Sequence, residues 1–230
     1  MVYCDRNTPP MNVSLEFLQP IYSPIYRKYV RHRLPRRRTV LNGVVTKAAR
    51  LLDPESRSPD HKRQHVGLIK QHVQEGDEVV EVGSGYGVCT IWAARQGASV
   101  TGYEGSSEMV EVVRDAVVVN SEIHDIDFSE RIDVRHALVG EGIDVWGSTA
   151  EAAVVHPSDL PSCDVLILDC EGAETDIVPA VVGNPSRAIV EVHPQFDADT
   201  ETIRETFASA GYETTVYELD EIDLVYAHND

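Results

Sequence analysis

The sequence predicts an α/β domain: a mostly parallel sheet of seven strands with helices on both faces and an antiparallel hairpin at its C-terminal end. Two observations predict this fold. From Asp77 onward, short apolar runs typical of strands alternate with segments whose apolar residues recur at helical spacing. Such strand–helix–strand units form right-handed crossovers, which make the strands parallel. The last two apolar runs are separated only by residues 218–221, too few for a crossover, so these two strands must pair antiparallel.

The elements of this domain follow one another in a regular order. Each expected strand is a short run of apolar and β-branched residues, and each expected helix has an apolar stripe. In chain order, the strands are expected over residues 78–82, 99–103, 131–139, 164–168, 188–192, 212–217 and 222–227. The helices are expected over residues 88–95, 106–120, 173–182 and 199–210.

The N-terminal part of the chain has a different pattern. Residues 40–52 and 60–74 carry apolar side chains at helical spacing, so both segments are expected to be helices. Pro and Ser residues indicate a loop over 53–59 between them. A short apolar helix is expected over 13–18, among several prolines.

The charge of the chain, −18 overall, is unevenly distributed. Residues 1–65 hold 13 Lys and Arg against 5 Asp and Glu, a net charge of +8, whereas residues 66–230 hold 7 against 33, a net charge of −26. We therefore expect a basic, partly helical extension over 1–65 and the α/β domain over 66–230. Such an acidic domain repels nucleic acids and anionic membranes. Only 4 of the 20 basic residues are lysine, and an acidic, lysine-poor composition resembles the proteins of salt-loving archaea and their viruses.

Several features of the sequence indicate a cytoplasmic protein. No apolar run approaches the roughly 18–20 residues that cross a bilayer, and the N-terminal residues lack the apolar core of a secretory signal. The four cysteines have no C-x-x-C spacing. They are therefore expected to be free thiols in a reducing compartment.

A glycine-rich turn, in the segment EVGSGYG, joins the first expected strand to the first expected helix. Glu81 is followed by Gly83, Gly85 and Gly87 at every second position. The G-x-G-x-x-G turn of dinucleotide-binding folds has its third glycine where Val88 stands here, and Val88 would crowd a pyrophosphate at the helix N-terminus. S-adenosylmethionine has no phosphates and needs close approach of the backbone, which these glycines allow. The turn therefore favours S-adenosylmethionine.

An acid at the end of the second expected strand, Glu104, completes the expected cofactor site. A carboxylate there can accept hydrogen bonds from both ribose hydroxyls, although dinucleotide sites use the same device. The negative domain also suits a cationic sulfonium better than a pyrophosphate. Glu81 is expected to hold the ammonium of the cofactor, directly or through water. The residues expected to bind the cofactor are Glu81, Gly83, Ser84, Gly85, Tyr86, Gly87, Glu104 and Gly105.

A second group of acids follows the fourth expected strand, in the segment LDCEGAETDIV. Asp169, Glu171 and Glu174 crowd one strand–helix turn, and Glu191 and His193 end the fifth strand. Acids at this place can simply favour the N-terminus of the next helix. They also meet at the carboxyl edge of the sheet, where open α/β sheets bind their ligands.

These motifs, in this order, resemble the FkbM-type methyltransferases. The resemblance runs over roughly residues 77–217 and rests on EVGSGYG, TGYEGSSEMVEVVRDAVVVN, SDLPSCDVLILDCEGAE and AIVEVHP. It implies a Rossmann-like class I methyltransferase fold and an S-adenosylmethionine-dependent transferase that methylates hydroxyls of sugars or small molecules. The strongest element is the D-x-E-G-x-E turn that begins at Asp169. The family often carries a lysine two residues before that aspartate, where this chain has Ile167.

Methyl transfer to a hydroxyl needs alignment of the reactants and benefits from a general base. Asp169, Glu171 and His193 are the expected catalytic residues, and His193 has the side chain that titrates nearest to neutral pH. A hydrogen-bonding role for His193 at the strand end is equally open. Oxygen ligands of this group would suit Mg²⁺, but their spacing gives no support for zinc, and we predict no metal.

The basic segment 26–38, YRKYVRHRLPRRR, leaves two interpretations. It can lie on the acidic domain and pair with its carboxylates, which we favour, or it can contact RNA, an anionic lipid face or an acidic substrate. A small molecule or glycan is therefore the expected acceptor. The alternatives are an RNA methyltransferase that uses the basic segment, and a scaffold protein that binds the cofactor without catalysis.

Overall fold

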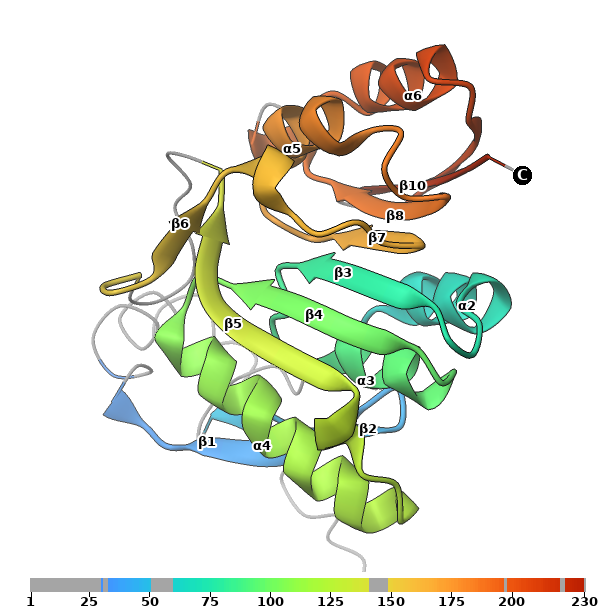
Figure 1. Cartoon of the computed structure of the whole chain (residues 1–230). Coiled ribbons are helices and arrows are strands. Elements are labelled where there is room, and N and C mark those ends of the chain that lie inside the picture. The colour runs from blue at the N-terminus through green and yellow to red at the C-terminus, as the bar shows by residue number, and fades with distance from the viewer. Residues whose placement is uncertain are drawn as a thin grey trace, which may run out of the picture.

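The structure, a computed structural model, confirms the predicted fold class. It describes residue 30 and residues 33–50, 60–140, 149–196, 198–219 and 222–229. In these residues one sheet has the strand order β6-β5-β4-β3-β7-β8-β10-β9 (Figure 1). Every pairing from β6 to β8 is parallel, and β10 pairs antiparallel with both of its neighbours. The expected helix over 13–18 and the expected loop over 53–59 lie outside the described residues.

The strands of this sheet match the expected ones to within one or two residues. They are β3 (Glu78–Val82), β4 (Ser99–Glu104), β5 (Ile132–Val139), β6 (Ala153–Val155), β7 (Val165–Leu168), β8 (Arg187–Val192), β9 (Glu213–Glu218) and β10 (Asp223–His228). The sequence predicted seven of them. The eighth, β6, is a three-residue edge strand too short to leave a recognisable pattern.

The helices cover both faces of the sheet, as predicted. They are α2 (Arg63–His72), α3 (Val88–Arg95), α4 (Ser107–His124), α5 (Glu174–Val181) and α6 (Thr200–Ser209), with short 3₁₀ turns η4 (Phe128–Glu130), η5 (Pro157–Asp159) and η6 (Pro194–Phe196). Figure 1 shows α2, α3 and α4 on one face and α5 and α6 on the other. The Cys residues that lie in or beside these elements, Cys89, Cys163 and Cys170, are free thiols.

Alternation along the strands produces two separate apolar cores. Successive side chains of a strand point to opposite faces. Val79 therefore packs in the core beneath α2, α3 and α4, whereas Val80 packs in the core beneath α5 and α6. In β7, Ile167 and Leu168 divide in the same way. Burial on both faces explains why these strands read as continuous apolar runs.

The connections place a topological switch point between β3 and β7. From β3 the chain winds outward through β4 to β5, and then returns to the other side of β3 to form β7 and β8. Loops that leave the carboxyl ends of β3 and β7 therefore lead to helices on opposite faces of the sheet, α3 and α5, and at such a point open α/β sheets form a crevice. Ligands of open α/β sheets bind in this crevice.

The helix expected over 40–52 is wrong where the structure describes it, because residues 40–50 belong to an antiparallel hairpin of β1 (Arg36–Leu41) and β2 (Val44–Arg50). Asn42 and Gly43 form its two-residue turn, with φ of 45° and 76°. An Asn-Gly pair between apolar runs is a strong hairpin signal. Val44 and Ala48, four residues apart, share the buried face of β2, a spacing that also fits a helix, whereas Val40 lies on β1 and is exposed. The helix expected over 60–74 is confirmed as α2.

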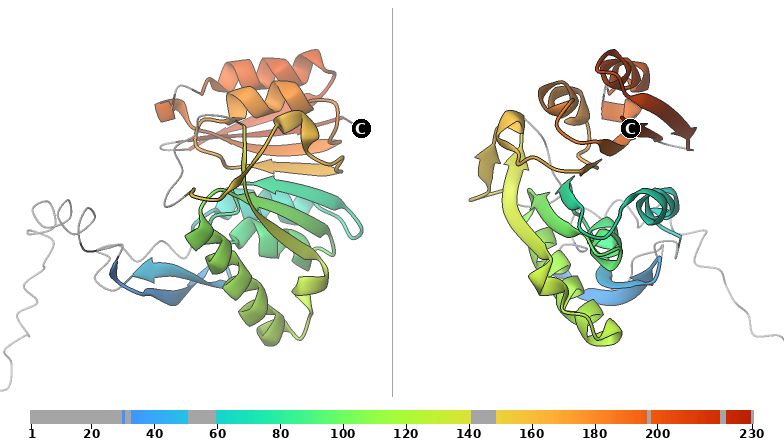
Figure 2. Two further views of the ribbon diagram at one scale, coloured as in Figure 1. Left: turned by 60° about the vertical axis from the view of Figure 1, so that its left-hand side comes forward. Right: turned by 45° about the vertical axis from the view of Figure 1, so that its right-hand side comes forward.

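The hairpin lies against α3 and α4 (Figure 2). The Asn120 side chain accepts a hydrogen bond from the Val45 N–H at 3.2 Å and donates one to the Val45 carbonyl at 2.8 Å. On the outer side, Arg38 and Lys47 pair with Asp115 at 2.9 and 2.8 Å. Arg36 and Arg38, from the described part of the basic segment, thus lie on the acidic domain and pair with its carboxylates.

Among the described residues, no helix combines the length and the apolar character that crossing a membrane requires.

The turn of the hairpin makes a testable prediction about stability. Gly43→Ala should lower the free energy of unfolding by about 1–2 kcal/mol, because an alanine in the left-handed region brings its Cβ too close to the backbone. Gly67→Ala, on the exposed side of α2 with no atom within 4 Å of the new Cβ, is the control and should raise it by about 0.5–1 kcal/mol. Chemical denaturation of both variants measures the difference. Equal effects of the two substitutions would contradict the hairpin turn.

Candidate active site

The glycine turn between β3 and α3 follows the backbone of β7 closely. Gly83, Gly85 and Gly87 have φ of 87°, 51° and 75°, all in the left-handed region that favours glycine. A Cβ on Gly83 would stand 1.8 Å from the carbonyl oxygen of Asp169. Only glycine therefore allows the turn to pass the end of β7, and this contact places both loops at the switch point.

Glu81 supports the glycine turn from beneath. Its side chain is buried and accepts hydrogen bonds from Ser84 Oγ at 3.0 Å and Thr90 Oγ1 at 2.5 Å. Burial raises the pKa of Glu81 to about 7, against the opposing effect of these two hydroxyls. The carboxyl group thus ties the turn to the first turn of α3. A contact between Glu81 and a cofactor stays a prediction.

Glu104 lies at the carboxyl end of β4, beside the glycine turn. It accepts hydrogen bonds from the N–H groups of Gly85 at 2.9 Å and Ser106 at 2.8 Å. Burial raises its pKa, and these backbone donors partly offset the effect. The next residue, Gly105, is also buried, and its carbonyl lies 3.1 Å from Nε2 of His136. Each carboxylate oxygen of Glu104 has a further lone pair for a ligand.

Tyr86 is held in the turn by the hairpin. Its carbonyl accepts a hydrogen bond from Thr46 Oγ1 at 2.8 Å, and the guanidinium carbon of Arg36 lies 5.8 Å from the centre of its ring. The ring of His61 lies edge-on at 6.1 Å. Sequence reasoning expected Tyr86 at the site but missed the contact with Thr46, which comes from the segment misread as a helix.

A network of charged side chains, which we call the acidic corner, lies at the carboxyl ends of β7 and β8. It comprises Lys62, Asp169, Glu174, Glu191 and His193. Lys62 Nζ lies 2.7 Å from Asp169 Oδ2 and also pairs with Glu191. His65 adds its Nε2 at 2.7 Å from Glu191 Oε2. Two residues that sequence reasoning left unassigned, Lys62 and His65, thus reach the site from the start of α2.

His193 is surrounded by carboxylates. Its Nδ1 lies 2.5 Å from Glu174, and its Nε2 lies 3.2 Å from Glu191 and 3.7 Å from Asp169. Burial lowers the pKa of His193, but the hydrogen bonds with Glu174 and Glu191 outweigh it and raise the pKa to about 10. An imidazolium has no lone pair to accept a proton. The raised pKa disfavours a role as a base near neutral pH, and the catalytic role of His193 stays a prediction.

The other ionised groups of the corner stabilise one another. Burial alone would raise the pKa of Glu191, but His193, His65 and Lys62 hold it well below its usual range. Burial likewise opposes the charge of Lys62, and the carboxylates of Asp169 and Glu191 raise its pKa. Removing one partner of such a buried ion pair lowers the free energy of unfolding, because it leaves the other charge buried without a counter-charge.

The two remaining acids of the D-x-E-G-x-E turn have different environments. Glu171 is partly buried within the turn itself, with a left-handed φ of 51°. Glu174, the first residue of α5, is fully buried and bonds to His193. The acid that completes the corner beside Asp169 and His193 is therefore Glu191, from the next strand, rather than Glu171. A catalytic role for Glu171 stays a prediction.

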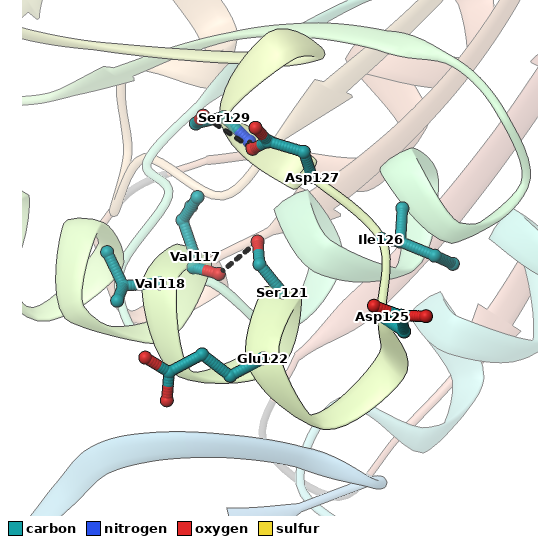
Figure 3. Close-up of a pocket in the computed structure, with 8 residues that line it drawn as sticks. All are labelled: Val117, Val118, Ser121, Glu122, Asp125, Ile126, Asp127 and Ser129. Carbon is teal, nitrogen blue, oxygen red and sulfur yellow. Dashed lines mark hydrogen bonds between the residues drawn. The ribbon is translucent and has the colours of Figure 1, made fainter.

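Two hollows lie on opposite edges of the sheet. One is at the C-terminal end of α4, next to the amino ends of the strands, and Figure 3 shows its lining residues, Val117, Val118, Ser121, Glu122, Asp125, Ile126, Asp127 and Ser129. The other has a volume of about 460 Å³, and its lining begins at Pro194, the residue after His193. Its lining residues are Pro194, Ala198, Asp199, Thr200, Glu201, Val216, Glu218 and Asp223.

No family model and no curated protein matches the sequence. Solved structures with the same fold include magnesium protoporphyrin IX methyltransferase from Synechocystis PCC 6803 with bound SAH. This match has a TM-score of 0.54 and 12% identity, and it covers 79% of this chain and 89% of that one. Precorrin-6y C5,15-methyltransferase from Geobacter metallireducens GS-15 has a TM-score of 0.52 and 14% identity, and the match covers 79% and 94% of the two chains. Ribosomal protein L11 methylase from Lactobacillus delbrueckii subsp. bulgaricus has a TM-score of 0.51 and 17% identity, over 78% and 83%.

These similarities define the class of fold. The chain has the Rossmann-like fold of class I S-adenosylmethionine-dependent methyltransferases. At 12–17% identity the comparisons show the fold alone.

The environment of His193 makes a prediction about pH. Its pKa of about 10 in the folded chain lies above the ordinary value of about 6.5. Its contribution to stability is therefore fully present below about pH 6.5 and is lost as the pH rises through about 10. Between these values the free energy of unfolding should fall more steeply for the wild type than for His193→Gln. His156→Gln, on an exposed turn, should follow the wild-type curve, and parallel curves for all three proteins would contradict the charged state of His193.

Proposed function

We propose that the protein is an S-adenosylmethionine-dependent methyltransferase that methylates a hydroxyl of a small molecule or glycan. The observation that carries this proposal is the position of Glu104. It is a buried carboxylate at the end of β4, hydrogen-bonded to the glycine turn and next to the switch point. Carboxylates at this position accept the ribose hydroxyls of nucleoside cofactors. The fold supports the same assignment.

The glycine turn fits S-adenosylmethionine better than a dinucleotide. Gly87 is the left-handed N-cap of α3, and a Cβ there would meet the Val113 side chain at 3.2 Å. The carboxylates of Glu104 and Asp169 flank the crevice, which repels a pyrophosphate and attracts a sulfonium. The turn and Glu104 would hold the cofactor. When bound, S-adenosylmethionine supplies an electrophilic methyl group whose transfer needs little more from the protein than alignment.

Asp169 is the residue that we place next to the reacting oxygen. It follows β7 at the switch point, beside Gly83, and its side chain is the most exposed of the corner's carboxylates, at 26% against 7% for Glu191 and 0% for Glu174. Its carboxylate would accept the proton of the acceptor hydroxyl as the oxygen–methyl bond forms. His193, held as a cation by Glu174 and Glu191, would orient Asp169 and stabilise its charge.

The hollow whose lining begins at Pro194 favours an uncharged, hydroxyl-rich acceptor. Four of its lining residues are acids, Asp199, Glu201, Glu218 and Asp223. Neighbouring hydrogen-bond donors lower the pKa of both Asp199 and Glu201, through Thr202 and Arg204. Carboxylates accept hydrogen bonds from sugar hydroxyls, whereas they repel phosphates. This supports a glycan or polyhydroxylated acceptor.

The resemblance to the FkbM type supports the same acceptor class, with one substitution in the site. Ile167 stands where that family often has a lysine, and its side chain is buried in the core beneath α2 and α3. In this chain Lys62 brings an ammonium to Asp169 from a distant part of the sequence. We therefore propose that the substitution at Ile167 changes how the acid of the D-x-E-G-x-E turn is held.

A methyltransferase for RNA is the alternative that the basic segment supports. Arg36, Arg38 and Lys47 each pair with Glu108 or Asp115 of α4, so these cations already have partners. Electrostatic binding of RNA depends on cations that can neutralise phosphates. The hairpin is thus better suited to hold the glycine turn than to bind a nucleic acid.

The assignment of Glu104 predicts the effect of one substitution on cofactor affinity. Glu104→Gln should weaken S-adenosylmethionine binding by about 10–100-fold, since one amide oxygen replaces two carboxylate oxygens and its NH₂ faces a backbone N–H. Glu78→Gln, exposed at the amino end of β3, is the control and should bind as the wild type does. Titration calorimetry with S-adenosylmethionine and S-adenosylhomocysteine makes the measurement. A wild-type chain that binds neither ligand would overturn the proposed function.

The acceptor class is tested by turnover and by RNA binding. The wild type should methylate members of a panel of sugars and phenols and should show no salt-dependent RNA binding at low ionic strength. Affinity for RNA that falls steeply with salt, together with no turnover on the panel, would favour the RNA alternative. Cofactor binding without turnover on either substrate class would favour the scaffold.

A further inference from the structure

Lys62 occupies the centre of the acidic corner. Its Nζ lies 2.7 Å from Asp169 Oδ2 and pairs with Glu191 Oε2, so one ammonium joins the ends of β7 and β8. Lys62 is the N-cap residue of α2, with a left-handed φ of 63° and no side-chain cap. A lysine rarely adopts this conformation, which costs about 1–2 kcal/mol. The surrounding contacts therefore hold Lys62 in an unfavourable backbone state to place its side chain here.

The groups around the ammonium form the kind of set that holds a divalent cation. Donor atoms of Asp169, Glu191 and His193 all lie within 4.8 Å of one another. The two carboxylates, joined by the His193 imidazole when metal binding releases its proton, suit Mn²⁺ and related ions. The ammonium of Lys62 contacts two of these three residues, so Lys62 and a divalent ion would compete for the same carboxylates.

The charges of the corner require a cation at this place. Asp169, Glu174 and Glu191 bring three carboxylates together, and His193 supplies one positive charge against them. Removing Lys62 would leave the buried Glu191 and the partly buried Asp169 short of a counter-charge, which is costly. A divalent ion would restore the balance. Lys62 thus neutralises the carboxylate charges that a metal ion neutralises in other oxygen-rich sites.

The side chain of Lys62 can also reach a ligand. It is 14% exposed, and two of the three N–H donors of an ammonium suffice for its two carboxylate partners. The ammonium thus has a third donor beyond those that its two carboxylate partners use. An acceptor oxygen brought to Asp169 would lie within its reach.

We propose that Lys62 is the fixed cation of this site: it takes the place of a divalent metal, positions the Asp169 and Glu191 carboxylates, and donates a hydrogen bond to an oxygen of the acceptor. This rests on the proposed function and names the residue that orients its acceptor. Lys62 keeps its proton throughout, and the proton of the acceptor hydroxyl goes to Asp169. Methyl transfer by the wild type is then independent of divalent metals.

The test is Mn²⁺ binding by the full chain, followed by electron paramagnetic resonance. Lys62→Ala should bind Mn²⁺ at least about tenfold more tightly than the wild type, because it opens the three-residue set. Lys62→Arg keeps the charge and should bind Mn²⁺ as weakly as the wild type. The double variant Lys62→Ala/Glu191→Gln should lose the added affinity. Circular dichroism confirms that each variant is folded.

Two further readouts separate this proposal from the proposed function. Calorimetry with S-adenosylmethionine should give the same affinity for the wild type and Lys62→Ala, because Lys62 lies outside the cofactor residues. Turnover of Lys62→Ala should fall by about 100-fold or more and recover in part with Mg²⁺ or Mn²⁺. The role of Lys62 would be overturned if the wild type bound Mn²⁺ as tightly as Lys62→Ala does. It would also be overturned if Lys62→Ala folded but gained no Mn²⁺ affinity, or if its turnover were unchanged. Absence of cofactor binding by the wild type would instead overturn the proposed function.

Discussion

The close contact between Gly83 and the carbonyl of Asp169 is the constraint on which the site depends. The two loops leave adjacent strands at the switch point, and a single added methyl at Gly83 would stand 1.8 Å from that carbonyl. Because the loops touch, the glycine turn and the acidic corner occupy one crevice. The candidate donor site at Glu104 and the candidate acceptor site at Asp169 are thus placed side by side by backbone packing, before any side chain is considered.

The N-terminal residues complete this arrangement from outside the α/β core. The hairpin bonds to the carbonyl of Tyr86 and packs on α3 and α4, and Lys62 and His65 enter the acidic corner ahead of β3. Leu41 and Val44 of the hairpin share an apolar core with α3 and α4. The described part of residues 1–65 therefore contributes directly to the site, whereas a division of the chain at residue 65 stays a prediction.

Most of the α/β domain could be predicted from the sequence, since its strands are buried on both faces and read as uninterrupted apolar runs. The hairpin was missed because the four-residue spacing of Val44 and Ala48 fits a strand as well as a helix, although Asn42 and Gly43 carried the turn signal. At the site, Asp169 and His193 could be singled out as candidates because each directly follows an expected strand. Lys62 was not, because it is 107 residues away from Asp169 and no local pattern marks an ion pair. The charge of His193 was also beyond prediction, as it depends on three carboxylates brought in by folding.

The central claim is that the crevice at the switch point binds S-adenosylmethionine beside the acidic corner. A crystal structure of the full chain with S-adenosylhomocysteine tests it most directly. The ribose hydroxyls should lie within about 2.6–3.2 Å of the Glu104 carboxylate, with the sulfur facing Asp169. A ligand bound elsewhere, such as in the hollow at the end of α4, or a ribose turned away from Glu104, would contradict the account.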